Sequence, residues 1–128
     1  MIDHIGLAVT DIQRSRAFYE KALRPLGFKV LKTAEPSATE GGGTAVMFGI
    51  EHVEFVIADN ERVGQGTHVA FRVESRALVD AFHRAALEAG GRDNGAPGIR
   101  SRYSPTYYGA FVHDPDGINV EAVCHAPA

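Results

Sequence analysis

The chain has 128 residues, of which 45% are hydrophobic and 23% charged, and its formal charge is −3 at pH 7. This balance is typical of one globular domain that buries a core without disulfides. The negative charge argues against nucleic-acid binding and anionic membranes, and no apolar run is long enough to span a membrane. The single cysteine excludes an intrachain disulfide, and with no leader pattern we expect a cytoplasmic protein.

The first half of the chain predicts one strand, one helix and three further strands. Thr10-Asp11 offers the side chains that cap a helix, and Pro25 and Gly27 end it. Polar residues with three consecutive glycines predict a loop over 35–43. The strands are expected at 2–9, 28–32, 45–49 and 52–58, and the helix at 12–23.

The second half predicts the same order of elements. Ser75 caps a helix expected over 76–89, and Gly90-Gly91 ends it. Strands are expected at 66–73, 107–113 and 118–124. Between them, glycines and prolines predict a long loop over 93–106. The sequence Asp114-Pro115-Asp116-Gly117 predicts a turn with no further role.

The two halves also match residue by residue. Residues 3–28 and 67–92 align without gaps at seven positions: His4/His68, Val9/Val73, Ala17/Ala81, Phe18/Phe82, Ala22/Ala86, Leu23/Leu87 and Gly27/Gly91. Further on, the pair Val53-Glu54 aligns with Val120-Glu121. The sequence therefore predicts a tandem β-α-β-β-β duplication in one domain, with module one at 1–59, a linker at 60–65 and module two at 66–128.

Each module places a histidine near the start of its first strand. Strand alternation puts His4 on one face with Gly6 and Ala8, and His68 on one face with Ala70. Small neighbours leave room around an imidazole ring. We therefore expect two equivalent strands to present His4 and His68 to one shared site.

This pattern resembles the vicinal oxygen chelate superfamily, which includes glyoxalase I, extradiol dioxygenases and bleomycin-resistance proteins. The resemblance covers essentially the whole chain. It rests on four motifs in order: Asp3-His4-Ile5-Gly6-Leu7-Ala8-Val9, Ser15-Arg16-Ala17-Phe18-Tyr19, Thr67-His68-Val69-Ala70-Phe71 and Asp114-Pro115-Asp116-Gly117-Ile118-Asn119-Val120-Glu121.

The resemblance implies an α+β fold in which the tandem modules form a curled mixed sheet around a central cleft, and it suggests a homodimer. It implies metal ligands at His4, His68 and Glu121. The family's fourth ligand position falls on Glu54 by the Val-Glu match, whereas a shift of one residue places Phe55 there and leaves three ligands. Such a set suits a divalent ion such as Zn, Ni, Fe, Mn or Co.

The implied function is a metal-dependent enzyme acting on a small molecule that chelates the ion through adjacent oxygens. The metal would act as a Lewis acid, Glu121 would hold it, and Glu54 would serve as general base in lyase or isomerase chemistry. A ring-cleaving dioxygenase or a thiol transferase fits the same residues. The alternative from a different class is a non-enzymatic, metal-free drug-binding protein of the bleomycin-resistance type.

A second group of side chains follows the expected long loop. It combines cationic and phenolic donors that suit an anionic or aromatic substrate, and we expect it to line the mouth of the cleft. The alternative is a packing strand flanked by solvated arginines. The group comprises Arg100, Arg102, Tyr103, Tyr107 and Tyr108.

Overall fold

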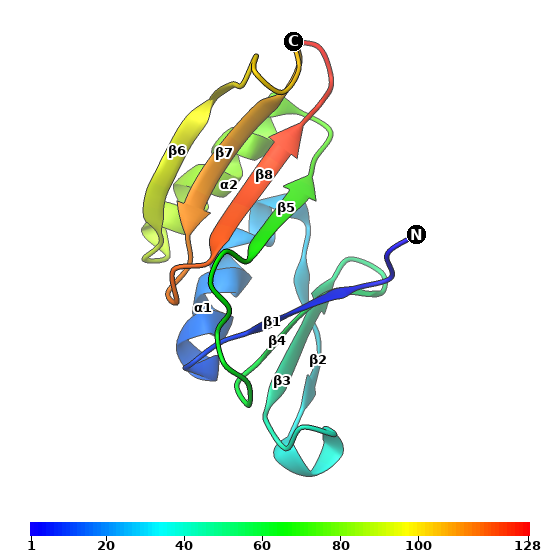
Figure 1. Cartoon of the computed structure of the whole chain (residues 1–128). Helices are drawn as coiled ribbons and strands as arrows, with labels where there is room; N and C mark the ends of the chain where they lie inside the picture. The colour runs from blue at the N-terminus through cyan, green and yellow to red at the C-terminus, as the bar shows by residue number, and fades with distance from the viewer.

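The computed structural model describes all residues, 1–128, and contains two four-stranded sheets with one α-helix for each (Figure 1). The first half contains β1 (Ile5–Ala8), α1 (Ile12–Ala22), β2 (Lys29–Ala34), β3 (Ala45–Gly49) and β4 (Val53–Ala58), with short 3-10 turns at Arg24–Leu26 and Pro36–Ala38. The second half contains β5 (His68–Arg72), α2 (Arg76–Glu88), β6 (Arg92–Ile99), β7 (Tyr108–His113) and β8 (Asn119–Cys124).

Both sheets have the same topology, which confirms the predicted α+β duplication. The strand order is β1-β4-β3-β2 in the first sheet and β5-β8-β7-β6 in the second. In each, the first strand pairs in parallel with the fourth, and the other pairs are antiparallel. Neither helix is long and apolar enough to cross a membrane.

The helices begin where the capping residues predict. Asp11 accepts a hydrogen bond from the backbone N–H of Arg14, and Ser75 accepts one from that of Leu78. The buried residues of α1 include Phe18, which contributes with residues of α2 and both sheets to one continuous core. The helices contact each other, and α2 lies behind β7 and β8 in Figure 1. Each sheet therefore has one face toward the helices and one outer face.

The turn at residues 114–117 does more than reverse the chain. Asp114 is 2% exposed and accepts a 2.5 Å hydrogen bond from the hydroxyl of Tyr19 on α1. Asp116 accepts hydrogen bonds from the backbone and the hydroxyl of Thr10. The expectation of a turn with no further role was wrong, because its two carboxylates fasten the second half of the chain to the first.

The long loop expected over 93–106 was also wrong in its first half, where β6 forms at the edge of the second sheet. The pairing of β6 with β7 shifts register between Asp93 and Gly95 and again between Gly95 and Gly98. An edge strand needs hydrogen bonds on one side alone, so it tolerates Pro97 and such irregularities. The connection that is left, which contains Arg100 and Arg102, is correspondingly short.

Candidate metal centre and cleft

Alternation along β4 and β8 decides which side chains reach the outer faces. On β4, Phe55 and Ile57 are fully buried toward the helices, so Glu54 and Val56 point outward. On β8, Val120 and Ala122 are fully buried in the same way. Asn119 and Glu121 therefore belong to the outer face of the second sheet, although other side chains cover Glu121.

Glu121 lies at the centre of this outer face and is 1% exposed. Its Oε1 lies 3.0 Å from Nε2 of His68, and its Oε2 accepts a hydrogen bond from the hydroxyl of Tyr107. His68 and Asn119 are paired across β5 and β8. The structure thus brings together the predicted ligands His68 and Glu121, together with the predicted substrate residue Tyr107.

The hydrogen bonds of His68 show what this pair requires. Its Nδ1 lies 3.0 Å from the backbone oxygen of Asn119, which can only accept, so Nδ1 carries a proton. In the neutral ring Nε2 then holds a lone pair, and this lone pair faces a carboxylate oxygen of Glu121. Two electron-rich atoms at that distance need a proton or a metal ion between them. A backbone bond that orients the ring is also the usual support of a metal-binding histidine, so these residues fit a divalent ion.

Tyr107 is held as a neutral donor. Its partial burial, followed by its hydrogen bond to Glu121, raises the pKa of its phenol well above the ordinary value of about 10. The rings of Tyr103 and His125 meet it edge-on, with centroids 5.0 and 5.2 Å away. Gly109 leaves room for the contact, since a Cβ there would lie 3.0 Å from Oε2 of Glu121.

These groups open onto a cavity of about 490 Å³, which we call the Glu121 cavity. Aromatic rings form most of its wall, and the ring of Phe111 stacks beside that of His68 with centroids 6.1 Å apart. Polar atoms are confined to a few positions, as in most small-molecule sites. Its lining residues are His68, Tyr103, Tyr107, Phe111, Asn119 and Glu121.

His4 does not join this group. It lies one residue before β1, its side chain is 56% exposed, and its Nδ1 lies 2.6 Å from Oδ1 of Asp3. That hydrogen bond lowers the pKa of the Asp3 carboxyl. No three His, Cys, Asp or Glu side chains lie close enough to hold a metal ion. The predicted set of His4, His68 and Glu121 is therefore not assembled within a single chain.

Glu54 lies near both predicted histidine ligands, His4 and His68. The parallel pairing of Ile5 with Phe55 places His4 and Glu54 at neighbouring positions, one residue earlier on each strand. Glu54 and His68 also line one hollow of about 390 Å³ beside the start of β1. His68 lines both this hollow and the Glu121 cavity, so the two are adjacent.

Strand register corrects the alignment of Glu54 with Glu121. In the first sheet Ile5 pairs with Phe55, and in the second the equivalent Val69 pairs with Val120. Phe55 therefore corresponds to Val120, and it follows that Glu54 corresponds to Asn119. The position that matches Glu121 is two residues further along β4 than the Val-Glu alignment indicated, and Val56 occupies it.

The predicted substrate residues divide between the two faces of the second sheet. Tyr103 and Tyr107 line the Glu121 cavity. The Arg100 guanidinium donates to backbone carbonyls of the preceding strand, β6, and lies 5.4 Å from the ring centre of Phe111. Tyr108 points the other way, toward α2, where its hydroxyl donates to Asp80 at 2.7 Å. Arg102 makes no hydrogen bond or ion pair.

Sequence reasoning missed Asn119 and Phe111 as cavity residues. Asn119 had an available signal, because it lies two residues before Glu121 and alternation places both on one face. Phe111 had none, since its place beside His68 depends on how β7 and β8 are paired: Phe111 pairs with Glu121 in the antiparallel register.

The comparisons with known proteins agree on one family. Residues 1–122 match the family model described as the Glyoxalase/Bleomycin resistance protein/Dioxygenase superfamily. A lactoylglutathione lyase from Salmonella typhimurium is 32% identical over 132 residues, spanning 94% of this chain and 89% of that protein.

Solved structures agree as well. A glyoxalase/bleomycin resistance protein from Albidiferax ferrireducens T118 superposes with a TM-score of 0.77 at 25% identity, covering 98% of both chains. Glyoxalase I from Zea mays superposes with a TM-score of 0.72 at 22% identity, covering 99% of this chain but 45% of that one. The maize chain is thus long enough for two domains of this size.

Proposed function

The chain belongs to the glyoxalase/bleomycin resistance protein/dioxygenase superfamily, and from this premise we propose that it is a metal-dependent enzyme with lyase or isomerase chemistry. Its substrate is a small molecule that presents two adjacent oxygens to the metal. The observation that supports this most is the pair of His68 Nε2 and Glu121 Oε1, 3.0 Å apart and opening onto the Glu121 cavity. A metal ion bound between these two atoms would neutralise the carboxylate and leave coordination positions open toward the cavity.

We assign the metal to His68, Glu121 and His4. Two imidazoles and one carboxylate suit Zn, Ni, Fe, Mn or Co and leave coordination positions free for a substrate. Once bound, such an ion supplies Lewis acidity that stabilises negative charge on substrate oxygens. The set has three ligands because Val56 occupies the position where a fourth ligand, a second carboxylate, would lie.

The remaining roles belong to side chains around the cavity. Tyr107 keeps its proton on the hydroxyl and directs it to Glu121, which holds that carboxylate in one orientation. Glu54 is ionisable, half-buried and beside His68 across the shared hollow, so we assign it as the general base that moves a proton on the substrate. Aromatic rings around Glu121 limit the access of water.

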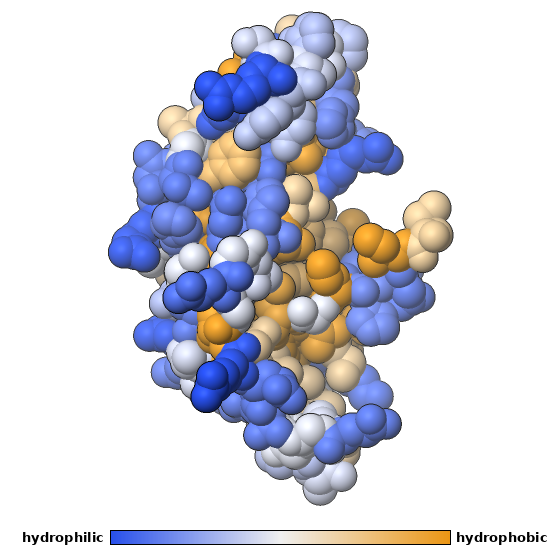
Figure 2. Space-filling view, viewed as in Figure 1, coloured by the Kyte–Doolittle hydropathy of each residue, from blue (hydrophilic) through white to orange (hydrophobic).

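We also propose that His4 comes from a second copy of the chain. Within one chain, His4 lies beside the first sheet, apart from the Glu121 carboxylate on the second sheet. The outer face of the first sheet carries a hollow of about 340 Å³ lined mainly by small apolar residues of β1 and β4. Hydrophobic side chains gather over the middle of the molecule, where β1 crosses it (Figure 2). A C2 dimer that places this face against the Glu121 cavity covers the apolar surface and completes two identical sites.

The first test is the metal content of protein purified without an affinity tag. We expect about one divalent ion per chain, and chelation followed by addition of Zn, Ni, Mn or Fe(II) identifies the ion that restores turnover. If the protein contains no transition metal and takes none up, the enzyme proposal is wrong and the drug-binding alternative stands.

Mixing two variants tests the shared site. His4→Ala and Glu121→Gln each disrupt every site in their own dimers. In a mixed dimer, one site receives both altered residues and the other receives neither. Metal uptake with the wild-type affinity should therefore return to about a quarter of the sites after random exchange of subunits. If mixing restores nothing although mixed dimers form, His4 and Glu121 do not meet across the interface.

A further inference from the structure

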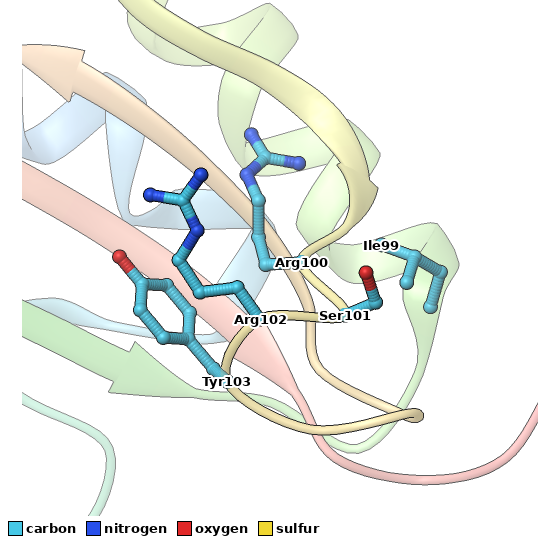
Figure 3. A pocket seen from close by; sticks show the side chains of 5 residues that line it. All are labelled: Ile99, Arg100, Ser101, Arg102 and Tyr103. Carbon is cyan, nitrogen blue, oxygen red and sulfur yellow. The ribbon is translucent and has the colours of Figure 1, made fainter.

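The short connection between β6 and β7 forms a further hollow that the metal site does not use. It has a volume of about 390 Å³ and is lined by residues 99–103, and it shares Tyr103 with the Glu121 cavity. Figure 3 shows the Arg100 and Arg102 side chains leaving the loop on one side, with the hydroxyl of Tyr103 beside the Arg102 guanidinium.

The positive charge of this hollow is not neutralised by any carboxylate. Arg100 donates to the backbone oxygens of Ala96 and Gly98 at 2.7 and 2.8 Å, which orients its guanidinium without cancelling its charge. Arg102 makes no hydrogen bond and no ion pair. The chain as a whole is acidic, with 16 acidic and 13 basic residues. Arg100 and Arg102 form no ion pair, so they make this hollow locally positive.

The hollow and the Glu121 cavity are adjacent, because Tyr103 lines both. Its ring meets that of Tyr107 with centroids 5.0 Å apart. These two rings lie between Arg102, which precedes Tyr103, and Glu121, which contacts Tyr107. A guanidinium fork recognises carboxylate or phosphate groups, and aromatic walls favour a flat apolar body between two polar ends.

We propose that Arg102 binds an anionic group of the substrate, while Tyr103 packs against the substrate's body. The substrate class is thus a small organic anion with a planar body, chelating oxygens at one end and a carboxylate or phosphate at the other. This inference rests on the proposed function for the chelating end. The anion site itself does not depend on the metal.

Benzoate binding to chelator-treated protein tests the proposal without metal. Titration calorimetry compares benzoate with benzyl alcohol, which has the same ring and no charge, and with inorganic phosphate. We expect saturable binding of benzoate that weakens as salt rises. Arg102→Gln should weaken benzoate about tenfold and leave benzyl alcohol unchanged, because the variant loses one charge-assisted hydrogen bond.

Two further variants sharpen the result. Tyr103→Leu should weaken benzoate and benzyl alcohol alike, because it removes the ring and keeps the charge. Arg84→Gln on α2 alters another exposed arginine with no hydrogen bond or ion pair and should leave all three probes unchanged. Phosphate that weakens with Arg102→Gln while benzoate does not bind assigns the anionic group as a phosphate.

Equal benzoate and phosphate affinity in wild type and Arg102→Gln overturns the anion site. Because metal is absent, this result is separate from the test of the proposed function. Metal uptake with no anion binding leaves the enzyme proposal intact and removes this inference. Anion binding in a protein that takes up no metal removes the enzyme proposal and leaves this inference intact.

Discussion

The contact between Tyr107 and Glu121 leads us to predict the stability of a Tyr107 variant, with or without metal. Tyr107→Phe removes one hydroxyl and keeps the ring against Tyr103 and His125. Glu121 is 1% exposed, so water cannot readily replace the donor that its Oε2 loses. The carboxylate keeps its contact with His68 alone and is free to turn within the space beside Gly109.

The size of the effect follows from burial and charge. A hydrogen bond to a charged group contributes about 1.5–3 kcal/mol, and Glu121 keeps one partner, so we expect a loss of about 2 kcal/mol in the free energy of unfolding. For a chain of this length that lowers Tm by roughly 6 °C. Loss of a residue that orients a ligand weakens metal binding about tenfold or more.

Tyr108→Phe is the matched control, because it removes the neighbouring hydroxyl on the opposite face. That hydroxyl donates to Asp80 on α2 and lies on the core side of β7, so the variant loses some stability and keeps its metal affinity. Urea unfolding of metal-free protein measures the first quantity, and competition with a chelator for zinc measures the second. All variants are compared at one protein concentration, because the proposed dimer would contribute to stability. If Tyr107→Phe matches wild type in both measurements, Tyr107 does not hold Glu121 in place.

Three other predictions concern stability and ligand number. Burial raises the pKa of Tyr19 well above 10, so the folded state keeps a proton that the unfolded state loses, and stability falls as pH rises beyond about 10; Tyr19→Phe should flatten that fall in urea midpoints measured between about pH 8 and pH 10.5. Glu54→Gln should keep the metal and lose turnover, and loss of metal would restore the four-ligand interpretation. Gly109→Ala should lower the free energy of unfolding by about 1–3 kcal/mol, because its Cβ meets Glu121. Gly6→Ala is its control, with the nearest atom 4.0 Å away, and an equal loss in both would refute the steric reasoning.

The sequence predicted the elements whose signals are local. Capping at Asp11 and Ser75 and the apolar stripes of both helices depend on residues within a few positions of each other. β6 depends on its partner instead. Gly95, Pro97 and Gly98 indicate a loop when read alone, and they form a strand only because β7 supplies a pairing edge.

The same distinction holds within the candidate site. His68 was predicted from the repeat and from alternation, and Glu121 from the family resemblance. Adjacent parallel strands bring the two together. Glu54 was aligned by a two-letter match, Val-Glu, that strand pairing contradicts by two positions. Two matching residues are too few to determine the register of a strand. Here a bulge near Gly49 in the β3–β4 hairpin shifts β4, and the two matching residues carry no sign of that shift.

The repeat also suggests more symmetry than the proposed site has. Equivalent strands present His4 and His68, but only module two adds a carboxylate ligand, since Val56 occupies the position in module one that is equivalent to Glu121. In the proposed dimer, module one contributes an imidazole and an apolar wall, and module two would hold a metal by two ligands before its partner binds. On this reasoning Glu121→Gln abolishes metal binding, whereas His4→Ala leaves a weaker site on His68 and Glu121. The unequal effect of the two changes distinguishes an asymmetric, three-ligand centre from one in which the modules contribute alike.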